Sequence, residues 1–193
     1  MSGERPPLSG TRLPFATLAL LVAGCAASFA AAPEVAGLFG AALFALALAV
    51  AIVDWREMII PDWMNAAILA LALVQAAATS DAGEAWSAAG EALLRGAALG
   101  CVLLLVRFVY RAARGHDGLG LGDVKLGFAG GAWVGWSLLP AAIEIAALSA
   151  LAVFLVAPRL SGRAPQWSER LPFGAFLAPA IWATWLIETL TAR

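Results

Sequence analysis

The chain has 193 residues, of which 62% are hydrophobic and 13% charged, with a net charge of −1 and a mean hydropathy of +0.86. Soluble domains carry roughly 25% charged residues, so this chain has too few charges to cover a water-facing surface. Strand-period alternation is missing from the sequence, which argues against a membrane β-barrel. We therefore predict an all-α fold: a polytopic membrane helix bundle with about six or seven transmembrane helices.

Apolar runs long enough to cross a bilayer recur along the chain and define the predicted helices. A run of about 20 residues spans the hydrocarbon core as a helix. Turn residues or charges separate the runs, and Pro140 marks the weakest break. Without that break, residues 123–158 would form one helix of about 54 Å, too long for one crossing. The seven predicted helices cover residues 13–32, 35–53, 62–79, 91–110, 123–139, 141–158 and 171–190.

The basic residues predict which side of the membrane each loop faces. With a cytoplasmic N-terminus, ten of the twelve Lys and Arg residues fall in cytoplasmic segments, and only Arg95 and Arg193 fall outside. This distribution follows the positive-inside rule. The loops on the opposite side carry the acidic residues Glu34, Asp81, Glu84 and Glu91. The cytoplasmic basic residues are Arg5, Arg12, Arg56, Arg107, Arg111, Arg114, Lys125, Arg159, Arg163 and Arg170.

Two carboxylates separated by 69 positions are predicted to share one depth and one face of the membrane. Asp54 lies at the cytoplasmic end of the second predicted helix, and Asp123 lies at the cytoplasmic start of the fifth. Each has an ordinary structural interpretation. Asp123 is suited to cap a helix N-terminus, and Asp54 could reach the interface beside Arg56. A carboxylate within the bilayer costs about 2.5 to 3.5 kcal/mol on insertion scales, which favours a functional interpretation for any that lies deeper.

The residues around the two aspartates favour a chemical role. The stretch DWREMIIPD, residues 54–62, places Pro61 seven positions after Asp54, and GLGLGDVKL, residues 118–126, brings in Asp123 on a backbone that another extended chain could approach closely. A phosphate-binding loop would need a preceding strand, which is missing here. Two nearby carboxylates cannot both ionise easily, so one can hold a proton while the other acts as a base. Such a pair can activate water and stabilise a tetrahedral intermediate.

Four segments together resemble the type IV prepilin peptidases, membrane aspartic peptidases of the GxGD class. The first is Asp54 followed by Pro61-Asp62, and the second is the GxGDxKL segment at residues 120–126. The third is GGAWVGW at residues 130–136, and the fourth is LPFGAFLAPA at residues 171–180. The order and spacing of these segments agree with the family over about residues 35–190.

The resemblance implies that Asp54 and Asp123 form the catalytic pair, with neither a metal nor a cofactor. The implied substrates are prepilins or pseudopilins, whose short basic leader ends in glycine and precedes a hydrophobic helix. Cleavage would occur at the cytoplasmic face of the inner membrane. The implied partners are these substrates, the lipid bilayer and a pilus or secretion machinery, and nucleic acid is not expected. The residues expected to bind substrate or support the site are Gly120, Gly122, Lys125, Pro61 and Asp117.

Three departures from the family pattern refine this expectation. Asp117 stands where the family often has glutamate, and Ala175 stands for the proline of PFGPF, which we interpret as a detail of the helix start. Larger members carry an N-terminal methylating domain with paired cysteines, whereas Cys25 and Cys101 are isolated in apolar runs. We therefore expect residues 1–193 to form a single peptidase domain without a methyltransferase domain. Such a domain resembles the peptidase-only form found with tight-adherence (Flp-type) pilus systems.

Other functions remain open at this stage. An archaeal preflagellin peptidase would use the same chemistry on another substrate. A carboxylate-dependent membrane transporter would need acidic residues near mid-bilayer and inverted repeats. A structural subunit of a secretion machine would not require the two aspartates to meet.

The glycines Gly127, Gly131 and Gly135 are expected to pack one face of the fifth helix against a neighbour, for which the Asp54 helix is the candidate.

Overall fold

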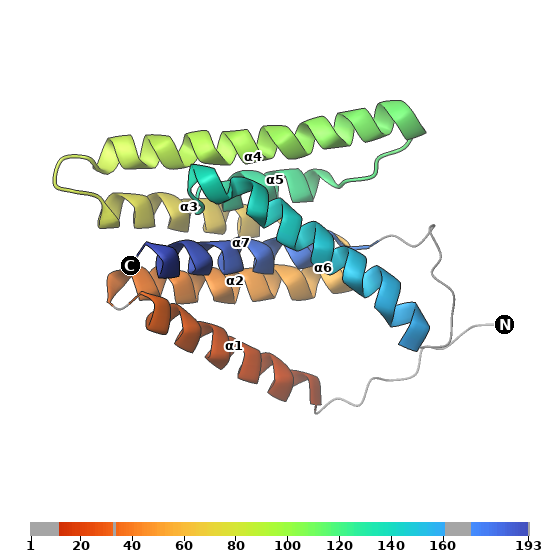
Figure 1. Cartoon of the computed structure of the whole chain (residues 1–193), viewed down its shortest axis with the longest axis horizontal. Coiled ribbons are helices and arrows are strands. Elements are labelled where there is room, and N and C mark those ends of the chain that lie inside the picture. Colours follow the sequence, from red (N-terminus) through yellow and green to blue (C-terminus); the bar gives the residue numbers. More distant parts are fainter. Residues whose placement is uncertain (1–11, 33, 161–170, 193) are drawn as a thin grey trace.

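The structure is a computed structural model that describes residues 12–32, 34–160 and 171–192. Over these residues the predicted all-α fold is confirmed, with seven α-helices, one short 3-10 helix and no strand (Figure 1). The elements are α1 (Arg12–Ala31), α2 (Val35–Glu57), α3 (Asp62–Thr79), α4 (Ala85–Arg114), α5 (Leu121–Gly131), η1 (Trp136–Leu138), α6 (Leu139–Leu160) and α7 (Gly174–Thr191).

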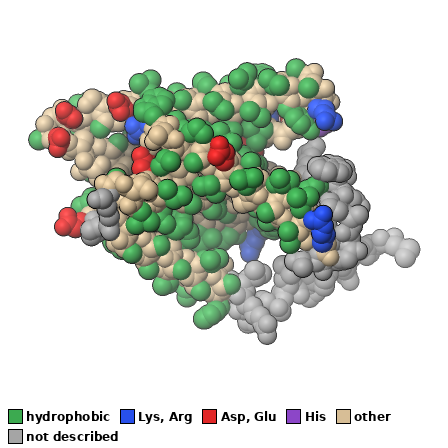
Figure 2. Space-filling view, viewed as in Figure 1, with side chains coloured by type: hydrophobic (Ala, Val, Ile, Leu, Met, Phe, Trp, Pro, Cys, Tyr) green, Lys and Arg blue, Asp and Glu red, His purple; other side chains and the backbone are tan. Residues whose placement is uncertain are grey.

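Several helices have the length and apolarity of membrane spans. Helices α2, α3 and α4 and the segment Trp136–Val156 meet both conditions. Many large apolar side chains point outward, among them Phe15, Leu105 and Trp86, and apolar atoms cover much of the face in Figure 2. A water-soluble monomer rarely exposes apolar surface so continuously. The chain is therefore a multi-pass membrane protein.

Local chemistry ends each helix near the two aspartates. Helix α2 ends because Met58 takes a left-handed conformation, with φ 56°, and donates its backbone N–H to the carbonyl of Asp54. Pro61 then caps α3 in an extended conformation, as proline does at a helix start. Helix α4 ends at Gly115, whose φ of 74° suits glycine. These turns bring the end of α2 and the starts of α3 and α5 to one end of the bundle (Figure 1).

The predicted fifth helix, residues 123–139, is wrong at its C-terminal end. Helix α5 stops at Gly131 after 11 residues, about 16 Å of helix, and cannot cross the hydrocarbon core alone. An irregular segment and η1 follow it, and Arg95 and Glu188 bind the freed backbone at Ala132 O and Gly135 N–H. Pro140, predicted to separate two helices, instead lies in the first turn of α6, where proline is tolerated.

The neighbour proposed for the glycine face of α5 is also corrected. Helix α5 packs on α4, α3 and α7. A methyl group on Gly127 would lie 2.3 Å from Leu103, and one on Gly131 would lie 2.9 Å from the carbonyl oxygen of Arg95. Both contacts are with α4, not with the Asp54 helix. Gly135 lies beyond the helix, beside Glu188.

Charge is distributed unevenly between the two ends of the bundle. Figure 2 shows basic side chains over the ends of α4 and α6, where Arg111, Arg114 and Arg159 lie in the last turns. Acidic side chains gather at the other end, around the loop between α3 and α4, with Arg95 as the basic exception among the described residues. Asp54 and Asp123 lie toward the basic end.

Candidate active site

Asp54 and Asp123 meet at the N-terminus of α7. Asp54 lies in the last turn of α2 and Asp123 in the first turn of α5. Both are buried, with 5% and 9% of their surface exposed. A methyl group built on Gly174 would lie 2.9 Å from Oδ2 of Asp54 and 3.0 Å from Oδ1 of Asp123. These two oxygens are therefore at most 5.9 Å apart, the sum of the two distances.

The glycine-rich loop positions Asp123 through its backbone. The N–H of Gly120, the residue that caps α5, donates to Oδ2 of Asp123 at 3.1 Å. This bond is the capping role that an aspartate at the third helical position can take. It engages one carboxylate oxygen, while Oδ1 is the oxygen that approaches Gly174. Capping and participation in the pair therefore coexist in one side chain.

Gly122 allows the loop between α2 and α3 to approach α5. A methyl group on Gly122 would lie 3.3 Å from Cβ of Ile60, a tight contact. Ile60 is buried, and its Cδ1 also lies 2.4 Å from the position of a Gly174 methyl group. Ile60 thus fills the space beside the two aspartates. Pro61, directly after it, caps α3 and fixes where this loop ends.

Asp117 anchors the loop that leads to Asp123 but does not join the pair. Arg107 of α4 donates to Oδ2 of Asp117 and to the carbonyl of Leu119, and Arg111 pairs with Oδ1 at 3.7 Å. These contacts tie the loop to the last turns of α4. Asp117 is therefore a supporting residue that acts through loop position.

Lys125 forms an ion pair with Asp62 and not with Asp54 or Asp123. Its Nζ lies 2.7 Å from Oδ1 of Asp62, and both side chains are at least half exposed. The pair links the beginning of α3 to the N-terminal part of α5. An exposed pair of this kind contributes about 0–1 kcal/mol to stability.

The start of α7 contributes a backbone donor and a glycine that were not predicted from the sequence. The N–H of Ala175 donates to Oδ2 of Asp54 at 2.8 Å, and Gly174 leaves room for both carboxylates. The segment LPFGAF was noted only as a point of resemblance, and Ala175 was interpreted as a detail of the helix start. A backbone donor carries no side-chain signature, so the one signal available was a glycine near the start of the helix predicted over residues 171–190.

No group of three or more His, Cys, Asp or Glu side chains is placed to hold a metal ion in the described ranges.

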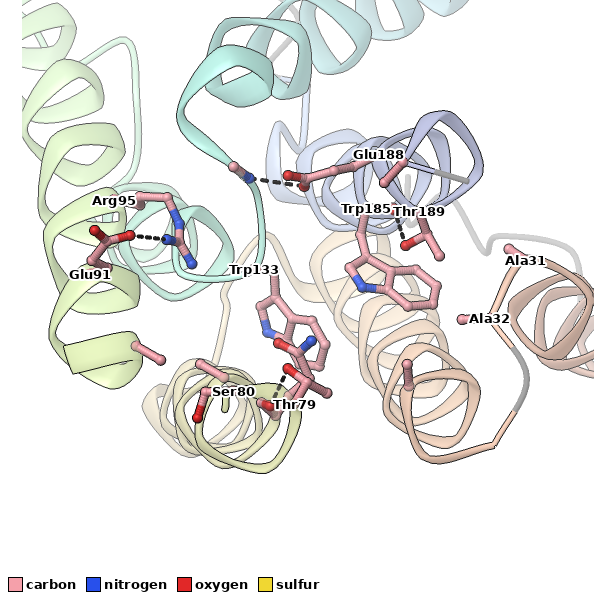
Figure 3. Close-up of a pocket in the computed structure, with 16 residues that line it drawn as sticks. Ala31, Ala32, Thr79, Ser80, Glu91, Arg95, Trp133, Trp185, Glu188 and Thr189 are labelled. Atoms are coloured by element: carbon pink, nitrogen blue, oxygen red, sulfur yellow. Dashed lines mark hydrogen bonds and ion pairs between the residues drawn. The ribbon is translucent and has the colours of Figure 1, made fainter. Parts of the chain in front are cut away.

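A pocket of about 650 Å³ opens at the opposite end of the bundle from the aspartates (Figure 3). Arg95, Trp133, Trp185 and Glu188 point into this region, where Glu188 accepts the N–H of Gly135. The pocket surrounds the irregular segment after α5 and contains neither Asp54 nor Asp123.

Comparison with known proteins agrees with the motifs. Residues 41–155 match the type IV leader peptidase family. A prepilin leader peptidase/N-methyltransferase of Burkholderia pseudomallei is 35% identical over 192 residues, 96% of this chain and 57% of that protein. The proteins of the same name from Dickeya chrysanthemi and Aeromonas hydrophila are 32% and 28% identical, covering 73% and 93% of this chain and 48% and 59% of their own length.

The chain thus spans about half the length of these relatives. No solved structure matches it. The family match covers more than half of the chain and includes both aspartates. The chain therefore belongs to the type IV leader peptidase family.

Proposed function

We propose that the chain is an aspartic endopeptidase that removes the leader from type IV prepilins, with Asp54 and Asp123 as its catalytic pair. The observation that supports this most directly is the meeting of two buried carboxylates from α2 and α5 beside Gly174. Family membership supports leader peptides as the substrate class. A transporter would carry its acidic residues near mid-bilayer, whereas this pair lies at helix ends.

The chemistry follows from sharing one proton between two close carboxylates. The ionised aspartate takes a proton from water, and the resulting hydroxide attacks the carbonyl carbon of the scissile peptide. The protonated aspartate donates a hydrogen bond to the carbonyl oxygen and stabilises the charge that develops there. The proton is then passed to the leaving amine, and the C–N bond breaks. Burial makes these interactions stronger than they would be in water.

We further propose that the substrates are Flp-type prepilins or pseudopilins and that they are cut at the cytoplasmic face of the inner membrane. The asymmetry of charge supports this orientation, because the aspartates lie toward the end with the arginine-rich helix termini. A basic leader would be held on that same side of the membrane.

Coexpression with an Flp-type prepilin tests the proposal. We expect wild type to shorten the prepilin, and Asp54→Asn and Asp123→Asn to lower cleavage by several orders of magnitude, because asparagine keeps the shape but cannot exchange the proton. Asp81→Asn is the matched control, since Asp81 lies in the loop between α3 and α4 at the other end of the bundle. It should cleave at the wild-type rate. The readout is prepilin size on a gel, with the mass of the product.

Each outcome has a distinct meaning. Wild-type cleavage by either Asp→Asn variant, at equal accumulation, would remove that residue from the mechanism. If wild type cleaves none of a panel of Flp-type prepilins but cleaves another prepilin, the Flp assignment fails and leader peptidase activity stands. An added methyl group on the mature terminus would contradict the expectation that the chain is a peptidase alone.

A further inference from the structure

The hydrogen bond to Asp54 comes from a helix remote in sequence. The N–H of Ala175 donates to its Oδ2 at 2.8 Å across 121 positions. Ala175 is the second residue of α7, so its N–H has no partner within its own helix. Asp54 lies at the N-terminal end of α7, where the first backbone N–H groups have no partner within the helix. The bond therefore pairs a free backbone donor with the buried Asp54 carboxylate.

Asp54 needs this donor more than Asp123 does. A helix C-terminus carries partial negative charge, and Asp54 lies in the last turn of α2. Asp123 lies at the favourable N-terminal end of α5 and accepts the N–H of Gly120 from its own helix start. The ionised form of Asp54 is thus opposed by its own helix and favoured by α7.

The ionisable groups around Asp54 do not replace the α7 donor in favouring its ionised form. Asp123 faces Asp54 from α5, and its charge disfavours ionisation of Asp54. Asp62 of α3 is paired with Lys125. On α7 the ionisable residue is Glu188, which lies at the far end of the helix against Gly135. Helix α1 also packs on α2, and its ionisable residues are Arg12 and Cys25. On α2 itself, the ionisable residues beside Asp54 are Arg56 and Glu57, which are exposed.

We propose that the backbone N–H of Ala175 is a positioning group that orients the Asp54 carboxylate toward Asp123 and favours its ionised form through the hydrogen bond. This inference rests on the proposed peptidase function. The identity of residue 175 matters for this contact, because the donor is its own backbone N–H. Proline has no N–H to donate. Ala175 therefore gives this chain a contact with its catalytic pair that a proline at the same place could not make.

The test is the pH dependence of kcat/KM for prepilin cleavage by the purified full chain. Ala175→Pro removes the N–H but places a ring carbon where the hydrogen pointed at Asp54, so the replacement of Ala175 with lactic acid isolates the loss of the donor. Without the donor, Asp54 ionises only at higher pH, so the acidic limb of the profile should move up by about one pH unit. At a pH on that limb the variant should lose about tenfold in kcat/KM. Replacing Ala175 with lactic acid substitutes an ester oxygen for the N–H, keeps the methyl side chain and should give the same shift.

Two controls separate the hydrogen bond from other effects. Ala175→Ser keeps the N–H, so its acidic limb should stay at the wild-type position whatever its maximal rate. Ala85→Pro places a proline at the first residue of α4, at the other end of the bundle, and should leave the profile unchanged. A wild-type acidic limb in either the proline or the lactate variant would overturn the inference. The peptidase proposal would still stand in that case, because it depends on the Asp→Asn variants.

Discussion

Gly174 is the residue at which the two aspartates and the α2–α3 loop come together. Its missing side chain leaves a position within 3.0 Å of an oxygen from each aspartate and 2.4 Å from Cδ1 of Ile60. Carbon atoms do not approach neighbours this closely without displacement. Glycine is therefore required here for space, and the backbone around it brings the N–H of Ala175 to Asp54.

The variant Gly174→Ala should accordingly lose activity. We expect cleavage to fall about 100-fold, since a displacement of about 1 Å in a catalytic group can have an effect of this size. Adding Ile60→Val removes the Cδ1 atom that the methyl group meets first. The double variant should recover thermal stability but not the rate, because both carboxylates remain crowded. Recovery of the full rate in the double variant would show that Gly174 matters only for packing against Ile60.

For the individual residues, the sequence predicted part of the candidate site. The positions of Asp54 and Asp123 at the ends of two apolar runs predicted a common depth, and the structure brings them together. Gly120 and Gly122 were expected to support the site, and in the structure the N–H of Gly120 binds Asp123 while Gly122 lies against Ile60. The part played by Gly174 and Ala175 was not predicted, because neither has an ionisable side chain and the donor is a backbone group.

Among the helices, α5 depends most on its neighbours for its position. It has only 11 residues and lies against α4, α3 and α7. The apolar pattern continues beyond Gly131, so the sequence predicted a helix to residue 139. What ends the helix is non-local: Arg95 binds the carbonyl of Ala132, and Glu188 binds the N–H of Gly135. Local periodicity contains no information on these two contacts.

The close packing of α4 on α5 at Gly96 gives a second testable prediction. A methyl group on Gly96 of α4 would lie 2.5 Å from the backbone oxygen of Phe128 on α5. Since a backbone atom cannot rotate away, Gly96→Ala should move α5 and destabilise the fold by about 1–3 kcal/mol. Cleavage should fall as well, because α5 carries Asp123. Thermal unfolding in detergent and the cleavage assay measure the two effects.

Gly90 supplies the matched control in the same helix. A methyl group there meets nothing within 4 Å. Gly90→Ala should therefore stabilise α4 by about 0.5–1 kcal/mol, because alanine is the better helix former, and leave cleavage unchanged. Equal unfolding temperatures for the Gly90 and Gly96 variants would contradict the proposed closeness of α4 and α5.

For the whole molecule, the sequence predicted the fold class because composition and run length reflect the bilayer directly. The two ends of the bundle also differ in charge as expected from the sequence, with arginines at the last turns of α4 and α6. Which end faces the cytoplasm depends on the membrane and on insertion. That orientation decides whether the aspartates can meet a leader peptide that has not crossed the membrane.

Cysteine labelling tests the orientation. Starting from a variant in which Cys25 and Cys101 are replaced by alanine, one new cysteine is placed at Ala82, in the exposed α3–α4 loop, or at His116, in the exposed loop before α5. A membrane-impermeant maleimide should label Ala82→Cys in intact cells and His116→Cys only after the inner membrane is opened. The reverse pattern would place Asp54 and Asp123 on the outer face. A cytoplasmic leader could then not reach them, and cleavage at the cytoplasmic face would be ruled out even if the Asp→Asn variants proved inactive.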